Sequence, residues 1–148
     1  MGHIPKNAKW YVAEVVEEIT VEGDPRNVVH LNLLLIRADS PDEAYERALR
    51  LGKQAEIKYE NASDKQVSIR FRGLKHLGVV HDELEDGAEL RYSERIAVTE
   101  QEMAKLLTPK EQLEVFRPIR PSEGPDYSSQ EVIQEAMGII HRNSGTGN

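Results

Sequence analysis

The chain contains no cysteine and only short hydrophobic runs. Without cysteine it has neither a disulfide framework nor a thiolate nucleophile, which fits a reducing compartment. No stretch reaches the roughly 18 to 20 apolar residues that cross a bilayer, and the opening MGHIPKNAKW lacks the apolar segment of a signal peptide. We therefore expect a cytoplasmic protein with no membrane partner.

Clustered basic residues are also scarce. The chain has 26 acidic and 19 basic residues, a net charge of −7, and its only compact basic run combines Arg70 and Arg72 with Lys75 and His76. A nucleic-acid binder needs clustered Lys and Arg to displace counterions from phosphates. We therefore expect no nucleic-acid partner.

Motifs of catalysis and metal binding are missing as well. The sequence has no Gly-x-Ser-x-Gly elbow, no glycine-rich phosphate loop and no His-Glu-x-x-His pattern. His76, His81 and Asp82 are the nearest approach to a metal site, but zinc needs three or four converging ligands. We interpret these histidines as surface residues and expect no metal and no cofactor, and whether the chain is an enzyme stays open.

The residues that are present predict one domain with an appendage, since 148 residues can bury one ordinary core. Two strand-forming segments, 10–19 and 28–38, flank the turn EGDPRN and predict a hairpin. Residues 67–73 alternate and residues 74–80 continue as an extended run, in which Gly73 and Gly78 indicate a bulge or bend. AELRYSERIAV, from Ala88, predicts a fourth strand.

Between the second and third of these strands, SPDEAYERALRLG predicts a helix. Ser40 can cap the first turn, Pro41 suits the first helical position, and Glu43 can complete a capping box. The apolar stripe that follows consists of small residues and one leucine, namely Ala44, Ala48, Leu51 and Ala55. The helix should therefore lie close against one face of the sheet.

The same Ser/Thr-x-x-Glu spacing recurs from Thr99, Thr108 and Ser128. A phosphorylation site is the functional alternative at Ser40, but helix capping explains all four occurrences with one mechanism. We therefore predict short helices from Thr99 and Thr108 and a longer one from Ser128.

These elements predict an α+β fold, a ββαββ antiparallel sheet of about four strands with one main helix on one face. We expect a core domain over residues 1–107 and a C-terminal extension over 108–148. In that extension, RPIRPSEGP predicts a proline-rich linker at 117–125, and the apolar periodicity of residues 129–141 predicts an amphipathic helix.

Parts of the sequence resemble a bacterial family of small proteins known as domain of unknown function four-two-eight-eight. The resemblance covers about residues 10 to 95 and rests on short motifs in a fixed order. These are Trp10 and Tyr11, Glu43 and Ala44, Tyr59 and Asn61, Phe71 and Gly73, and Asp86, Gly87, Glu89 and Leu90. The resemblance implies no activity, so it adds no catalytic residue.

Our main hypothesis is a non-catalytic protein-interaction module that acts as a homodimer. Both faces of the first two strands carry apolar residues, and one helix covers only one face, so a second cover is needed. Either the terminal helix or a second copy could supply it. The expected interface comprises Trp10, Val12, Val16, Leu34, Ile36, Val132, Ile133, Met137 and Ile140.

Two other hypotheses remain open. One is a small anionic ligand, or an enzyme substrate, bound where two neighbouring strands bring guanidinium groups together. Its candidate residues are Arg70, Arg72, Arg91 and Tyr92. The other is an acidic inhibitor or immunity-like protein that blocks a basic protein partner, which the net charge alone suggests.

Overall fold

The computed structural model describes residues 9–119 and 123–129. Four strands form one antiparallel sheet in the order β2-β1-β4-β3. The elements are β1 (Trp10–Val21), β2 (Val28–Arg37), α1 (Pro41–Gln54), β3 (Ile57–Glu60), β4 (Gln66–Val79) and α2 (Glu100–Leu106), followed by the 3-10 turns η1 (Lys110–Gln112) and η2 (Glu114–Phe116). The predicted α+β class and ββαββ element order are confirmed.

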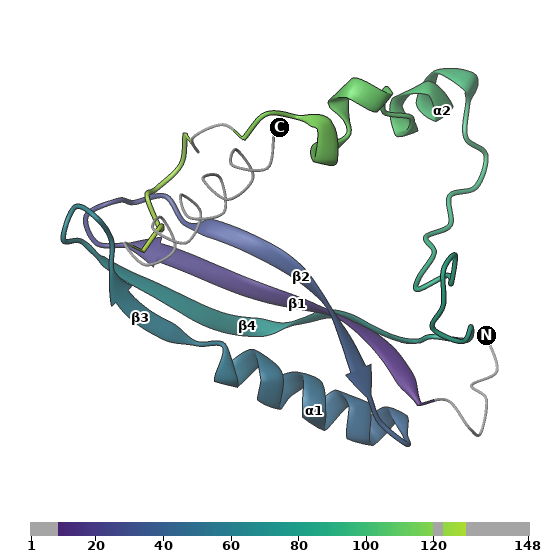
Figure 1. The fold of residues 1–148 in the computed structure, drawn as a ribbon, viewed down its shortest axis with the longest axis horizontal. Helices are drawn as coiled ribbons and strands as arrows, with labels where there is room; N and C mark the ends of the chain where they lie inside the picture. The colour runs from purple at the N-terminus through teal and green to yellow at the C-terminus, as the bar shows by residue number, and fades with distance from the viewer. Residues whose placement is uncertain (1–8, 120–122, 130–148) are drawn as a thin grey trace, which may run out of the picture.

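The sheet is strongly twisted, with α1 along one side of it (Figure 1). After β4 the chain leaves the sheet and forms α2 on the side opposite α1. It then returns to the sheet at the end where the turn between β1 and β2 lies (Figure 1). This path separates a compact ββαββ unit from a long excursion that follows it.

The sequence explains where α1 begins. The hydroxyl of Ser40 accepts a hydrogen bond from the backbone N–H of Glu43 at 3.1 Å, and Pro41 follows at the first helical position. The carboxylate of Glu43 reaches back to the N–H of Asp39 at 3.2 Å, one residue before the expected partner. Capping at Ser40 is thus confirmed.

The other three predicted caps have different outcomes. Thr99 caps α2, accepting from the N–H of Glu102 at 3.2 Å. The cap at Thr108 is wrong, because Pro109 is extended and η1 begins after it without a side-chain cap. The helix expected from Ser128 lies outside the described residues, as do the predicted interface residues Val132, Ile133, Met137 and Ile140.

Two bulges keep the apolar residues of β4 on the helix-side face of the sheet along the whole strand. The pairing with β1 shifts twice and leaves Arg72 and Lys75 as extra residues on β4. Each extra residue switches the alternation, because side chains of a strand point to opposite faces in turn. The residues that share the helix-side face are Val67, Ile69, Phe71, Leu74, Leu77 and Val79. The bulge expected at Gly73 is confirmed, whereas Gly78 lies in regular pairing with Val12.

The predicted strand from Ala88 is wrong. Residues 88–98 contain no strand, and the short β3 takes the place beside β4. A tight turn explains this choice: the side-chain oxygen of Asn61 accepts from the N–H groups of Ser63 and Lys65, each at 2.9 Å. β1 pairs with one edge of β4, and β3 pairs with residues 66–69 on the other edge; among the described residues no strand pairs with the rest of that edge.

Most of the buried apolar residues form two clusters on the helix-side face, while Val12 is buried on the opposite face. The first lies between α1 and the sheet and includes Tyr11, Ala13, Val15, Ala44 and Ala48. The second consists of Ile19, Val21 and Val67, packed with partly buried Val28, Tyr59, Ile69 and Tyr127. Part of the C-terminal extension therefore completes the core.

Candidate functional site

The sheet face opposite α1 is open along β2. Val12 pairs with Leu35 and Tyr11 with Ile36, so Leu35 shares the face of Val12, and Ile36 lies under the helix. The exposed large residues of this face on β2 are Val29, Leu31, Leu33 and Leu35, with exposed fractions of 51%, 47%, 63% and 44%. We call these four residues the β2 stripe.

The register corrects part of the predicted interface. Trp10, Val12 and Val16 do lie on the face of the β2 stripe. Leu34 and Ile36 do not, because they pack with the cluster under α1, so grouping these two with Trp10 was wrong. Sequence reasoning divided β2 into the correct two faces but matched them to the wrong faces of β1.

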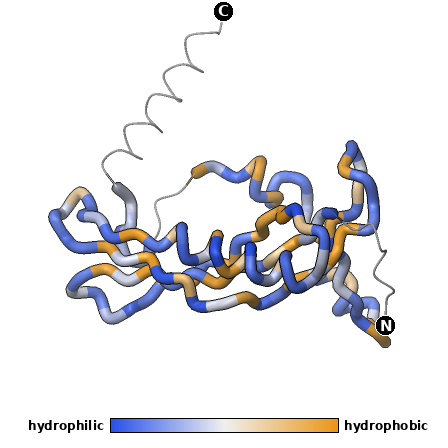
Figure 2. The backbone as a smooth tube through the Cα atoms, turned by 90° about the horizontal axis from the view of Figure 1, so that it is seen from below, coloured by the Kyte–Doolittle hydropathy of each residue, from blue (hydrophilic) through white to orange (hydrophobic). Residues whose placement is uncertain are grey.

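Hydrophobic residues follow the strands, whereas the turns of α1 are mostly hydrophilic (Figure 2). The helix contributes a narrow apolar stripe, with Ala44, Ala48 and Gly52 buried and acidic and basic residues elsewhere. One helix of this kind covers one face of the sheet, and the β2 stripe stays exposed on the other.

Two ion pairs cross the open face beside the stripe. Arg91 donates through Nη1 to Oε2 of Glu14 at 2.6 Å, and Glu14 is buried. Arg72 contacts Glu18 at 3.7 Å. Glu14 and Glu18 are four positions apart on β1, about 13 Å along a strand. The two guanidinium groups are therefore held apart by separate carboxylates.

These pairs bear on the predicted anion site. Arg70 is exposed on β4 opposite Glu18, and 71% of Tyr92 is exposed. The structure brings Arg91 and Tyr92 to one cleft of about 520 Å³ at the end of β4, which is also lined by His76, His81 and Asp82. Arg70 and Arg72 do not line this cleft. Among the described residues, no group of three or more acidic or histidine side chains could hold a metal ion.

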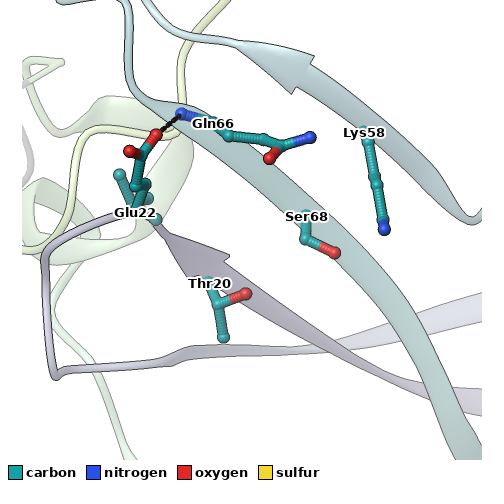
Figure 3. A pocket seen from close by; sticks show the side chains of 6 residues that line it. Thr20, Glu22, Lys58, Gln66 and Ser68 are labelled. Atoms are coloured by element: carbon teal, nitrogen blue, oxygen red, sulfur yellow. Dashed lines mark hydrogen bonds between the residues drawn. The ribbon is translucent and has the colours of Figure 1, made fainter.

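A smaller polar hollow lies on the same face, across β1, β4 and β3. Thr20, Ser68 and Lys58 line it from three neighbouring strands, and Glu22 closes one end by accepting from the N–H of Gln66 at 3.0 Å (Figure 3). Lys58 is the one basic residue in its lining. This hollow of about 240 Å³ is open and offers no buried charge to orient a ligand.

Residues 123–129, which we call the tip segment, contact the sheet through hydrogen bonds and one aromatic ring. The amide of Asn61 donates to the carbonyl oxygen of Asp126 at 2.8 Å, and the hydroxyl of Tyr59 donates to the carbonyl oxygen of Tyr127. The Tyr127 ring meets His30 edge to face, with centroids 5.5 Å apart. A bridge between Asn61 and Ser129 extends the pairing. We call Tyr59, Asn61, His30 and Arg26 the tip site.

At the other end of the tip segment, the charged side chain of Arg26 binds the backbone. Arg26 donates through Nη1 to the carbonyl oxygen of Glu123 at 3.2 Å. Asp24 accepts from Nη2 of Arg26 at 2.9 Å, and its hydrogen bonds from Arg26 lower the pKa of Asp24 to about 2. Burial raises the pKa of Tyr59, whose phenol is the donor to Tyr127. The tip segment is thus held at both ends.

Sequence reasoning missed the tip site. Tyr59 and Asn61 appeared there as family motif residues and as a turn, which is part of their role. The residues 123–125 of the tip segment were instead assigned to a proline-rich linker. Periodicity carries no signal for a pairing between residues 65 positions apart.

The fold and these surfaces define an α+β protein whose four-stranded antiparallel sheet has one covered and one open face. The chain belongs to the family "Domain of unknown function (DUF4288)", whose model matches residues 10–93. No curated protein and no solved structure matches the chain. The family match ends before the tip segment, so this chain carries the occupant of its tip site outside the shared domain. Within the described residues, every helix is too short or too polar for a bilayer crossing.

Proposed function

We propose that this protein is a non-catalytic interaction module that associates with itself as a homodimer through the open face of the sheet. The β2 stripe carries the proposal, because four large apolar side chains lie in a row and each is close to half exposed or more. Burying the exposed half of one such side chain contributes about 1 kcal/mol. Within the described part of the chain, the stripe is thus a source of association energy that stays unused.

The position of β2 supports the same proposal. It is an edge strand of ten residues, so one side of its backbone has no neighbouring strand in the described part of the chain. Exposed edges are usually protected by proline, lysine or a bulge. VVHLNLLLIR has no proline and no lysine, and it pairs with β1 in continuous register. A strand of this kind is suited to burial against another chain.

The anionic-ligand hypothesis has less support. Arg72 and Arg91 already pair with Glu18 and Glu14, which offsets the charge that an anion would meet. The cleft beside Arg91 and Tyr92 is where a ligand would bind if this prediction is right.

Light scattering after size exclusion tests the proposed function. We expect the native protein to have the mass of a dimer, and Leu33→Arg to have the mass of a monomer, because a charge in the stripe opposes burial. Leu84→Arg is the matched control, since Leu84 is an exposed leucine in the loop after β4. It should remain dimeric.

The controls make the result decisive. Leu33 is 63% exposed, so Leu33→Arg should keep the native free energy of unfolding per chain. A native protein that is monomeric from micromolar to submillimolar concentration contradicts the proposed function.

A further inference from the structure

Residues 99–119 form an arm that lies apart from the sheet and α1 in the described part of the chain. Every residue of the arm is exposed, including all of α2, η1 and η2. The large apolar residues among them are Met103, Leu106, Leu107, Leu113, Val115, Phe116 and Ile119. Such a density of exposed apolar side chains marks a surface that is meant to be covered. The described part of the chain therefore holds two exposed apolar surfaces, the arm and the β2 stripe, and does not bring them together.

The ends of the excursion show where the arm must run. Before the arm, Arg91 is fixed to Glu14 near one end of β1. After it, Glu123 is fixed to Arg26 in the turn between β1 and β2, at the other end of the sheet. Figure 1 shows the arm passing between these two ends on the side opposite α1. The tip segment thus enters its site beside the edge strand that carries the β2 stripe.

We propose that the two chains of the homodimer exchange arms. The tip segment of each copy fills the tip site of the other, and the apolar residues of each arm cover the β2 stripe of the other copy. The contacts of the tip segment with Tyr59, Asn61 and His30 are the same whichever chain supplies it. Exchange therefore loses none of these contacts and adds the burial of both apolar surfaces.

This inference rests on the proposed function, because it describes how the homodimer forms. Simple pairing of β2 with β2 across a two-fold axis would also cover the stripe, but it would leave every apolar residue of the arm exposed. Arm exchange is the arrangement that uses the arm, the stripe and the tip site at once.

Cross-linking decides which chain supplies the tip segment, and the absence of cysteine gives a clean background. Arg26→Cys with Glu123→Cys places two thiols where the tip segment meets the β1–β2 turn. A short bismaleimide should then join two chains, seen as a covalent dimer on a denaturing gel. As the control, Thr20→Cys with Ser68→Cys lies on directly paired positions of one sheet and should cross-link within a chain.

Mixing two single variants removes any ambiguity. Arg26→Cys and Glu123→Cys, combined and allowed to exchange subunits, can cross-link only if the tip segment of one chain meets the turn of another. Covalent heterodimer supports arm exchange. A protein that light scattering shows to be dimeric, but in which the double variant cross-links only within chains, overturns arm exchange and leaves the proposed function standing. A monomeric native protein overturns both.

A second variant tests the arm without touching the tip site. Ile119 is 97% exposed in its own chain, so Ile119→Arg cannot weaken the fold of the single chain through lost packing. We expect it to weaken dimerisation about tenfold or more, as replacing an anchoring side chain of an interface does. An unchanged dimer dissociation constant overturns the role of the arm.

Discussion

The two halves of the helix-side face are covered in different ways. One half lies under α1, which follows β2 after a turn of three residues and buries Ala44 and Ala48 completely. The other half lies under the tip segment, which reaches it from more than sixty residues away along the chain. The first cover is local and apolar, and the second is distant and held largely by hydrogen bonds.

The two covers also differ in how closely they approach the sheet. At Gly52 of α1, an added Cβ would lie 2.4 Å from the ring of Phe71, so helix and sheet are in direct contact. The tip segment instead presents carbonyl oxygens to Tyr59 and Asn61 and packs one ring, Tyr127, over the second cluster. Substitutions that enlarge a side chain should therefore lower the free energy of unfolding most under α1. Substitutions that remove a hydrogen bond should lower it most under the tip segment.

The largest expected effect is that of Ala48→Leu. Ala48 has no exposed surface, and a larger side chain would force α1 away from the sheet, so we expect a loss of about 1 to 3 kcal/mol in the free energy of unfolding. Urea denaturation measures it. Arg47→Leu, an exposed neighbour on α1, is the control and should stay within about 0.5 kcal/mol of the native value. An unchanged midpoint for Ala48→Leu would contradict close packing under α1.

The next largest effect is expected at Asn61, because its side chain hydrogen-bonds both the β3–β4 turn and the tip segment. Asn61→Ala removes three hydrogen bonds of a buried side chain and should cost about 1 to 3 kcal/mol in the free energy of unfolding. Asn61→Asp keeps the side-chain oxygen that accepts from Ser63 and Lys65, but it loses the donor to Asp126. Its effect should be smaller and confined to the tip segment.

Hydrogen exchange separates the two roles of Asn61. In Asn61→Asp, the amide of Ser129 should exchange faster, while the amides of Ser63 and Lys65 keep their protection. Equal loss of protection in the turn and in the tip segment would mean that the tip segment is not an independent cover.

The same contrast explains what the sequence could predict. α1 was predictable because its cap at Ser40 and its stripe of alanines are short-range signals. The face assignment of β2 failed because LLLI places apolar residues at successive positions, so alternation alone could not choose between the two registers. Only the pairing of Tyr11 with Ile36 decides it.

The wrong strand prediction at residues 88–98 and the missed tip site have a different cause. Ala88 begins a segment with the composition of a strand, but strand formation also needs a pairing partner, and β4 pairs with β1 and with the short β3 instead. The tip site depends on Asn61 meeting Asp126, and no local pattern records such a contact. Local signals thus predict elements well, whereas the competition among elements for partners decides the surfaces.

The smallest expected effect on the free energy of unfolding comes from removing a helix cap, and two caps of nearly equal geometry can be compared. Ser40 and Thr99 each accept from the N–H three residues on, at 3.1 and 3.2 Å, but α1 packs on the sheet and α2 has no buried residue. Ser40→Ala should lower the free energy of unfolding by about 0.5 to 2 kcal/mol, the usual cost of a lost cap. Thr99→Ala should leave it unchanged, because α2 can unwind without exposing the core. Both are measured by urea denaturation in the Leu33→Arg background, which we expect to be monomeric, so that association does not contribute. An equal loss for Thr99→Ala would show that α2 packs against its own sheet, and the arm would then not be free to cover another chain.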